Sequence, residues 1–349
     1  MVRNGFLRVL LWPVAWLYGM VVTLRGWLYD VGWLRSESVQ VPTLVVGNLA
    51  VGGTGKSPMA RDLLERLAGR GGNVALLSRG YGRQTKGFRM VDAERSKASE
   101  VGDEPLMAAR GLPGTTVAVC EDRVQGCRRL AELRSPLRAV VLDDAYQHRR
   151  LRGKVNLLLT EYGRLYVDDY PLPVGRLRDT ARQSHRADAV VVTKCPKELS
   201  QEGAARIEGH LGLRAGKRVL FTAVEHGEPY SLLGELKQEA WGRVTEVVGV
   251  AGIANPAPFF EWLAQEKHLV GTLALRDHQR YRERDVQRLK QWAAKGRKIV
   301  TTEKDAVRLE EAARGDMTLL QAVWVAPVAV RWLFDGENEI EELLDGLLR

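Results

Sequence analysis

Residues Thr43–Ser57, with the sequence TLVVGNLAVGGTGKS, have the composition and spacing of a phosphate-binding loop. An apolar strand, Thr43–Val46, leads into a glycine-rich turn, and a helical pattern follows Pro58. Glycines let backbone N–H groups turn inward around a polyphosphate, and the helix N-terminus adds partial positive charge. The residues expected to hold the phosphates are Gly52, Gly53, Thr54, Gly55, Lys56 and Ser57. We therefore predict that the chain binds a nucleoside triphosphate.

The last two residues of this loop have the clearest chemical roles. Lys56 is expected to reach the outer phosphates, and the Ser57 hydroxyl is expected to bind Mg²⁺. One residue departs from the strict pattern, because Ala50 stands five positions before Gly55, where a glycine is usual. Gly47 opens the loop earlier, which predicts a loop of a different shape. An ordinary glycine-rich turn is the alternative, and the flanking strand and helix favour phosphate binding over it.

The composition is that of a folded protein with anionic partners. The chain has 349 residues, of which 45% are hydrophobic and 27% charged, and it is long enough for two domains. The net charge of +9 favours binding to nucleic acid, phospholipid or a phosphorylated substrate, without choosing among them. Cys120, Cys127 and Cys195 lack the spacing of a metal site and cannot form a disulfide framework, which fits a reducing cytosol.

Residues 1–35 differ in kind from the rest of the chain. Between Gly5 and Leu24 the only charged residue is Arg8, and four of the nine tryptophans lie in residues 1–35. A spanning helix needs about 20 apolar residues, and Pro13 and Arg8 interrupt this segment. Tryptophan and arginine at this density favour a helix at the membrane interface, or shallowly inserted. A true span and a helix buried against the protein remain open, whereas no small-residue cleavage site supports a signal peptide.

Beyond residue 35, short apolar strands alternate with helical segments, which predicts an α/β fold with a parallel sheet covered on both faces. The expected strands of the first half are Thr43–Val46, Asn73–Leu77, Thr116–Val119, Arg138–Leu142, Asn156–Thr160 and Ala189–Thr193. Those of the second half are Arg218–Ala223, Val244–Val250, Leu269–Ala274, Lys298–Thr301 and Leu319–Val325. We expect a P-loop NTPase-type domain over residues 36–216 and a smaller α/β domain over residues 217–349 that closes over the active site.

Sites in parallel sheets lie at the carboxyl ends of the strands, where Asp143 and Asp144 fall. A carboxylate there is suited to hold Mg²⁺ beside the Ser57 hydroxyl, although a pair of solvated loop acids is the alternative. A GTPase switch would have Asp-x-x-Gly, and a guanine-reading loop would have Lys-x-Asp; neither follows Asp143 or Lys194. ATP is therefore the expected nucleotide.

Phosphoryl transfer also requires a base for the acceptor hydroxyl. Asp103 lies at a helix start, His148 follows Asp144 by four residues, and His278 lies in the second half of the chain. Spacing alone leaves all three candidates open.

A series of ordered motifs supplies a resemblance. They are GNLAVGGTGKSP, LSRGYGR, GDEPLM, LDDAYQHRRL, GRLRD, AGIANP, RDHQRY and TTEKDAVRL. Together they resemble the tetraacyldisaccharide 4′-kinases, the lipid A 4′-kinase family, from about Val41 to Leu309. The resemblance implies transfer of the ATP γ-phosphate to the 4′-hydroxyl of a tetraacylated glucosamine disaccharide 1-phosphate. The family acts at the cytosolic face of the bacterial inner membrane, which would explain the apolar N-terminus.

The resemblance also implies roles for individual residues. Asp103 would be the base, His278 would pair with it across the interdomain cleft, and Asp143 and Asp144 would join Ser57 in the Mg²⁺ site. Asp179 stands where the family usually has Glu, so a shorter carboxylate is expected to serve the metal there. A further set matches positions that line the site: Tyr81, Arg123 and His148.

Two residues depart from the family's motifs, and the sequence also predicts the binding partners. Gln279 replaces a second histidine of the family, so catalysis should not need that histidine, and Tyr146 replaces a common phenylalanine. The expected partners are the glycolipid and the membrane surface, with neither nucleic acid nor an obligate protein partner. The basic clusters His148–Arg152 and Arg176–Arg186 suit lipid headgroups and the substrate 1-phosphate. The rival hypothesis is a membrane-associated P-loop switch or ATPase; a nucleic-acid ATPase rests on net charge alone.

Overall fold

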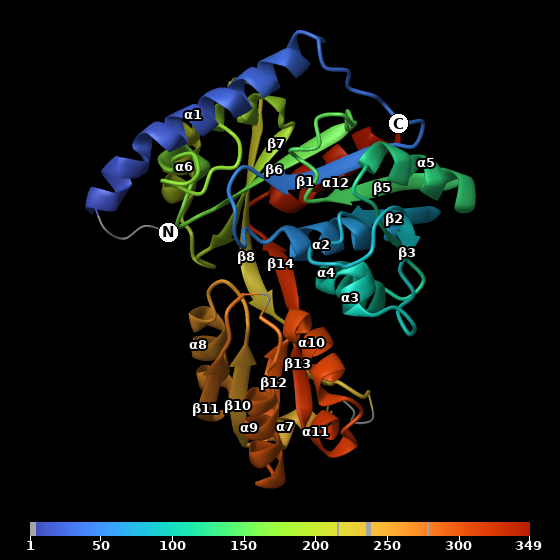
Figure 1. The fold of residues 1–349 in the computed structure, drawn as a ribbon, viewed down its shortest axis with the longest axis vertical. Coiled ribbons are helices and arrows are strands. Elements are labelled where there is room, and N and C mark those ends of the chain that lie inside the picture. The colour runs from blue at the N-terminus through green and yellow to red at the C-terminus, as the bar shows by residue number, and fades with distance from the viewer. Residues whose placement is uncertain (1–4, 215, 235–238, 278) are drawn as a thin grey trace.

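The computed structural model describes residues 5–349 except 215, 235–238 and 278. In the view of Figure 1 the larger sheet lies above the smaller one, and a long helix lies across the top of the larger unit. His278, the expected partner of Asp103, lies outside the described residues.

The larger sheet has nine strands in the order β14-β8-β7-β6-β1-β5-β2-β4-β3. Its strands are β1 (Thr43–Asn48), β2 (Asn73–Ser78), β3 (Arg89–Met90), β4 (Thr116–Val119), β5 (Leu137–Asp143), β6 (Val155–Glu161), β7 (Ala189–Cys195), β8 (Arg218–His226) and β14 (Val328–Trp332). All neighbours are parallel except the two edge pairs, β3 with β4 and β14 with β8. The predicted parallel α/β sheet is confirmed, and each strand predicted in the first half lies within an observed strand.

Helices cover both faces of this sheet. All six residues of β1 are buried, because alternate side chains enter different cores. Leu44 and Val46 pack with α2 (Lys56–Gly69), α4 (Asp103–Gly111) and α12 (Gly336–Leu348). Val45 packs in the opposite core, to which α5 (Arg123–Leu133) and α6 (Gln201–Leu211) contribute. The short α3 (Ala98–Val101) precedes α4.

The smaller sheet has five strands in the order β11-β10-β12-β13-β9. Its strands are β9 (Tyr230–Ser231), β10 (Glu246–Ala251), β11 (His268–Ala274), β12 (Lys298–Thr302) and β13 (Val323–Ala326). Its helices are α7 (Glu239–Gly242), α8 (Ala257–Glu266), α9 (Glu283–Ala294), α10 (Glu303–Ala313) and α11 (Met317–Gln321). The strand expected over Leu319–Val325 was wrong at its start, because residues 319–321 belong to α11 and the strand begins at Val323.

The expected domain boundary after residue 216 does not coincide with the division between the sheets. The chain leaves the larger sheet through β8, builds the smaller sheet and returns through β14, so both strands belong to the larger sheet (Figure 1). Helix α12 then packs on the larger sheet through Ile340, Leu344 and Leu347. Residues 218–226 and 328–349 therefore complete the first unit, and two neighbouring strands connect it to the second.

The N-terminal helix α1 (Gly5–Asp30) rests on the larger unit along a narrow stripe of small residues. Ala15 is fully buried, Gly19 faces Pro171 and Gly26 faces Gln183, whose Nε2 would have to shift to admit a Cβ at Gly26. The Tyr18 hydroxyl donates a hydrogen bond to the Arg178 carbonyl oxygen at 3.0 Å. The helix is therefore attached to the protein by one face only.

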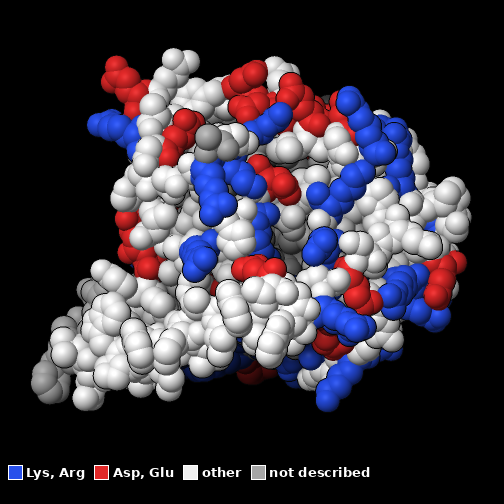
Figure 2. Space-filling model, turned by 90° about the horizontal axis from the view of Figure 1, so that it is seen from above, with Lys and Arg blue, Asp and Glu red and all other residues white. Residues whose placement is uncertain are grey.

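The remaining faces of α1 are apolar and exposed. Its exposed large side chains include Val9, Leu10, Trp12, Val14, Trp16, Leu17, Met20, Val21, Leu24 and Trp27. Residues Val9–Asp30 are long and apolar enough to cross a membrane by length and composition, and 11% of their most apolar window is buried. Figure 2 shows this helix as a nearly uncharged band beside a face on which Lys and Arg gather. Full burial of the helix against the protein is excluded for its described side chains.

Candidate active site

The glycine-rich loop connects β1 to α2, as the sequence predicts for a P-loop. Gly52 has φ = 114° and Gly55 has φ = 78°, a region of backbone conformation that other residues rarely adopt. Lys56 and Ser57 begin α2, so their backbone lies in the helix's first turn. Gly47 is still in β1 rather than in the loop, and it packs directly against Tyr146.

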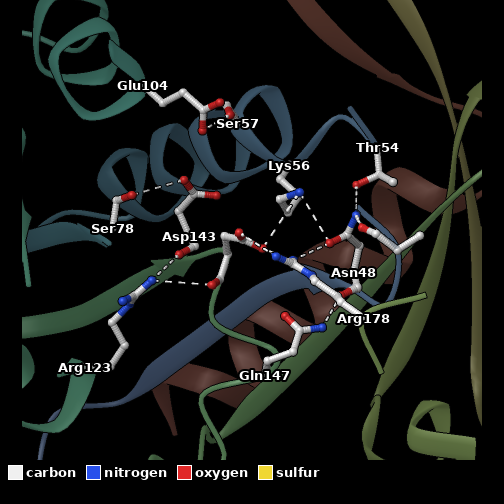
Figure 3. Close-up of polar contacts among 12 residues, drawn as sticks. Asn48, Thr54, Lys56, Ser57, Ser78, Glu104, Arg123, Asp143, Gln147 and Arg178 are labelled. Atoms are coloured by element: carbon white, nitrogen blue, oxygen red, sulfur yellow. Dashed lines mark hydrogen bonds and ion pairs between the residues drawn. The ribbon is translucent and has the colours of Figure 1, made fainter. Parts of the chain in front are cut away.

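Asn48 organises the loop from beneath. Its side-chain Nδ2 donates to the Ala50 carbonyl oxygen at 2.6 Å and to Thr54 Oγ1 at 2.8 Å. Its Oδ1 accepts hydrogen bonds from Arg178 Nη2 at 2.6 Å and from Lys56 Nζ at 3.3 Å (Figure 3). Asn48 is fully buried, so its whole hydrogen-bonding capacity serves to hold the loop.

Asp144 faces the cationic side of the loop. Its carboxylate forms an ion pair with Arg178 and lies 3.8 Å from Lys56 Nζ. Burial acts to raise the pKa of Asp144, but the charge of Lys56 and the hydrogen bond from Arg178 more than offset it, so that pKa is lowered. Asp144 is therefore an anion that holds Lys56 and Arg178 in place.

Asp143 has the opposite environment. It is 3% exposed; Ser78 Oγ donates to its Oδ2 at 3.5 Å, and its Oδ1 has no hydrogen-bond partner among the described residues. Burial, followed by the charges of Glu104 and Asp144, raises the pKa of Asp143 to about 7. A buried carboxylate oxygen without a partner, among other acids, is a group that a cation would stabilise.

Ser57 and Glu104 complete this acidic side. The Ser57 hydroxyl donates to Glu104 Oε2 at 3.0 Å (Figure 3), and Glu104 Oε1 lies 3.5 Å from Lys304 Nζ of α10. No group of three or more His, Cys, Asp or Glu side chains in the described residues is arranged for a metal ion. A nucleotide-bound Mg²⁺ needs fewer, because phosphates and water supply most of its ligands. The Ser57 hydroxyl and the Asp143 carboxylate fit that requirement.

Asp103 lies where the two units meet. It begins α4, and its Oδ2 is 3.6 Å from Nε of Arg308, which belongs to α10. A cavity of about 470 Å³ between the units is lined by Asp103 and Tyr81 from one side and by Arg280, Arg308 and Arg314 from the other. Glu283 and Glu311 line it too, so the cavity combines three carboxylates with three arginines, a mixed polar lining that suits a hydroxylated substrate.

The chain matches the family described as tetraacyldisaccharide-1-P 4′-kinase over residues 7–349. It belongs to this family. A tetraacyldisaccharide 4′-kinase of Flavobacterium johnsoniae is 39% identical over 96% of this chain and 95% of its own length. One from Cytophaga hutchinsonii is 40% identical over 99% of this chain and 98% of its own length. The resemblance read from the motifs is thereby confirmed.

A solved structure agrees with the fold. LpxK from Aquifex aeolicus, crystallised in complex with ATP, superposes with a TM-score of 0.78 and 27% identity, covering 98% of this chain and 100% of that one. Membership of a kinase family agrees with a P-loop that carries Lys56 and Ser57 beside two strand-end carboxylates. ATP, which we expected from the absence of guanine-reading motifs, is the nucleotide of the matched structure.

Two residues expected to line the site of this kinase make contacts at the end of β5, and their place in the site stays a prediction. Arg123 is 2% exposed, and its guanidinium donates to the carbonyl oxygens of Asp143 at 3.2 Å and Asp144 at 3.4 Å. His148 Nε2 accepts a hydrogen bond from the Arg123 backbone N–H at 3.4 Å, and burial, then the charge of Arg123, lowers its pKa. Arg123 therefore holds the end of β5, and His148 contacts Arg123. Tyr81, by contrast, is 70% exposed at the cavity.

Asp179 has its contacts beside α1. It is 6% exposed, its Oδ1 accepts from the Thr180 backbone N–H at 2.9 Å, and its Oδ2 is 3.9 Å from Arg186. Burial raises the pKa of Asp179. None of these contacts joins it to Ser57 or Asp143, and its metal role stays a prediction.

Three residues of the site were not found from the sequence. Asn48, Arg178 and Glu104 all lie within the motifs GNLAVGG, GRLRD and GDEPLM, but nothing local indicates what each contacts. Asn48 would have been the easiest of the three to predict, because an Asn at the end of an otherwise apolar strand needs hydrogen-bond partners for a buried amide.

Proposed function

We propose that this enzyme transfers the γ-phosphate of ATP to the 4′-hydroxyl of a tetraacylated glucosamine disaccharide 1-phosphate, a step in making lipid A. The main support for the proposal is that the structure has both a P-loop and a separate polar cavity. In that cavity Asp103 meets the cationic side chains of the other unit. A switch or ATPase needs only the P-loop, whereas a kinase needs a place for its acceptor beside the loop.

The P-loop half of the reaction follows from the polar contacts. Lys56, held by Asn48 and Asp144, would contact the β- and γ-phosphates, and the N–H groups at the start of α2 would bind them further. Mg²⁺ would be held by Ser57 and Asp143, where it would neutralise charge on the phosphates. Ser57 donates to Glu104 in this structure, so loading requires that hydroxyl to turn toward the metal side.

The acceptor half depends on Asp103. We expect its carboxylate to accept the proton of the 4′-hydroxyl as the hydroxyl oxygen bonds to the γ-phosphorus. The bond from that phosphorus to the β-phosphate bridging oxygen breaks, and ADP leaves. Arg308, with its Nε 3.6 Å from Asp103 Oδ2, would orient the carboxylate toward the acceptor. His278 belongs to the proposal as a partner of Asp103 by family resemblance alone.

We expect the two units to close over the substrates, because they are joined by only two strands, β8 and β14. Ion pairs join the faces of the units, Arg61 with Glu303, Arg110 with Glu310 and Lys304 with Glu104. A small buried apolar cluster also joins them, in which Val307 of α10 packs with Val101 and Leu106. Identical angles between the units with and without nucleotide would contradict closure.

The acceptor is an amphiphile, so the enzyme must work at a bilayer. We propose that α1 lies at the cytoplasmic face of the inner membrane, with its exposed apolar faces in lipid and its small-residue stripe on the protein. This arrangement keeps the P-loop in contact with cytosolic ATP while the acyl chains remain in the membrane.

The test is transfer of labelled phosphate from γ-labelled ATP to purified tetraacyl disaccharide 1-phosphate in neutral detergent micelles. Asp103→Asn should lower transfer by roughly 10²–10⁴-fold, the usual contribution of a general base, with thermal unfolding near that of the wild type. Asp168→Asn is the matched control, because Asp168 is exposed and pairs only with His210 in the described contacts. If Asp103→Asn still transferred phosphate at the wild-type rate, the kinase activity would be supported but Asp103 would not be its general base.

The rival hypothesis makes a different prediction in the same assay. A P-loop ATPase would hydrolyse ATP at the same rate with and without the glycolipid and would label nothing. ATP turnover that rises with added acceptor, and label on the acceptor, would exclude it.

A further inference from the structure

A second strongly basic cavity lies away from the P-loop, at the C-terminal end of α1. Its volume is about 540 Å³, and five arginines line it: Arg149, Arg152, Arg182, Arg186 and Arg214. Asp30, the last residue of α1, is the only acidic residue among its described lining residues. None of the P-loop residues lines it, so it is separate from the nucleotide site.

Two of the five arginines are engaged by the protein itself. Arg149 forms an ion pair with Asp30 at 2.7 Å and donates to Gln183 Oε1 at 2.9 Å. Arg186 donates to the Tyr146 carbonyl oxygen at 3.0 Å, and its guanidinium carbon lies 4.1 Å from the centre of the Tyr146 ring. These contacts hold both arginines in the wall of the cavity, and the ion pair with Arg149 neutralises Asp30.

The other three arginines carry charge that the protein does not compensate. Arg152, Arg182 and Arg214 are exposed, and within the described residues their guanidinium groups make neither a hydrogen bond nor an ion pair. Three uncompensated positive charges around one cavity raise the local concentration of anions. Guanidinium groups are the side chains best suited to bind phosphate oxygens in pairs.

The surroundings of the cavity indicate which kind of phosphate compound it would bind. Arg182 also lines a second, largely apolar cavity of about 660 Å³ along α1, with Trp12, Trp16, Leu24 and Trp27. Arg182 therefore stands at the junction of an apolar surface and a basic one. An anion bound here would have its phosphate directly beside hydrocarbon, as in a membrane phospholipid and unlike a free phosphate.

We propose that this basic cavity binds the phosphate headgroup of an anionic phospholipid that remains in the bilayer, and so fixes how the enzyme is oriented on the membrane. The inference rests on the membrane placement proposed for α1. Helix α1 would supply insertion and the cavity would supply the preference for anionic lipid. Because the cavity lies at one end of the helix, the two contacts together define the direction of the helix in the membrane plane.

The test compares two triple variants of the full chain with equal loss of charge. Arg152→Gln, Arg182→Gln and Arg214→Gln together remove the uncompensated charges of the cavity. The matched control combines Arg95→Gln, Arg243→Gln and Arg284→Gln, three exposed arginines of other elements. Binding is measured by flotation with vesicles of phosphatidylcholine alone and of phosphatidylcholine mixed with phosphatidylglycerol, at low salt. Transfer in neutral detergent micelles is measured beside it.

The wild type should bind the phosphatidylglycerol vesicles more tightly than the neutral ones. The cavity variant should lose roughly fivefold in that binding per arginine, or about 100-fold in all. Its binding to neutral vesicles and its KM for the glycolipid in micelles should not change, and the control variant should behave as the wild type.

Four results would overturn the proposal. Equal losses in the two variants would mean that only net charge matters. A raised KM for the glycolipid in micelles would assign the cavity to the substrate 1-phosphate. Displacement from the vesicles by inorganic phosphate, at matched ionic strength, would assign it to free anions. If the wild type bound neither kind of vesicle, the proposal that α1 lies on the membrane would also be wrong. Phosphate transfer in micelles would still test the proposed kinase activity separately.

Discussion

The P-loop and the interface between the two units are built in contrasting ways. Beneath the P-loop, Asn48 is fully buried and each of its side-chain polar atoms is used, so the loop has one well-defined shape before any nucleotide binds. Between the units, ion pairs between partly exposed side chains, such as Arg110 with Glu310, lie beside one small apolar cluster around Val307. Exposed ion pairs contribute little to stability, and the two units are joined by only two strands.

This difference indicates which half of the site is preformed. The phosphate-binding half needs no rearrangement beyond the turn of the Ser57 hydroxyl, whereas the acceptor half is completed by a unit that can move. Preorganised donors stabilise developing charge most effectively when they are fixed, and substrates must still be able to enter and leave. Three predictions test this contrast, beginning with the largest effect.

Replacement of Asn48 should damage the rigid half most. Asn48→Ala removes donors to Ala50 and Thr54 and leaves Arg178 with one acceptor fewer, so we expect about 2 kcal/mol less stability and a raised KM for ATP. Asn48→Asp keeps an acceptor for Arg178 but loses both donors, and should also raise that KM. The measurements are thermal unfolding and ATP saturation curves.

The control for Asn48 is Asn338→Ala, since Asn338 is exposed at the start of α12 and donates only to Asp335. It should leave both measurements near their wild-type values. A loop that tolerates Asn48→Ala with unchanged KM would show that it is shaped by the nucleotide rather than by this amide.

The two adjacent aspartates should respond to pH in opposite directions. The folded-state pKa of Asp143 is raised to about 7, so the folded protein keeps a proton that the unfolded chain loses near the usual carboxyl pKa. Asp143 therefore costs stability as pH rises toward 7, and Asp143→Asn should stabilise the nucleotide-free enzyme at pH 8, by about 2 kcal/mol, and much less at pH 5.

Asp144 is the matched comparison because its pKa is lowered, by Lys56 and Arg178 against the effect of burial. Its contribution is present above the usual carboxyl pKa and is lost as pH falls through the lowered value. Asp144→Asn should therefore destabilise the enzyme at pH 8. Thermal unfolding of both variants from pH 8 down to about pH 3 covers both titrations, and shifts of the same sign at pH 8 would show that the two carboxylates do not have distinct roles.

Much of the larger sheet could be predicted, for a physical reason that β5 illustrates. A strand buried on both faces is a short apolar run, and Arg138–Leu142 lies within the observed Leu137–Asp143. The same reasoning failed at Leu319–Val325, because an apolar helix end and an apolar strand adjoin there, and periodicity cannot separate them. Chain order likewise could not show that β8 and β14 pair in the larger sheet.

The candidate site was predicted where its residues are adjacent in sequence and missed where they are distant. Lys56 and Ser57 belong to one local motif, but Arg178 reaches Asn48 from 130 residues away and Glu104 reaches Ser57 from 47. Such contacts depend on how loops from different strand ends converge, which no local pattern records. Arg123 shows the converse: its motif position was found, but the sequence could not show that it is buried and donates to the carbonyl oxygens of Asp143 and Asp144.

The interface between the units should be the least sensitive region. Arg110 and Glu310 are about one-third exposed, so Glu310→Gln should change the free energy of unfolding by less than about 1 kcal/mol. It should nevertheless speed hydrogen exchange in α4 and α10, since it weakens a contact that holds the units together. Glu132→Gln, in the exposed pair of Glu132 with Arg129 on one helix, should cost as little and leave that exchange unchanged. If Glu310→Gln were as destabilising as Asn48→Ala, the interface would be as rigid as the P-loop, and closure would have to occur by bending within β8 and β14.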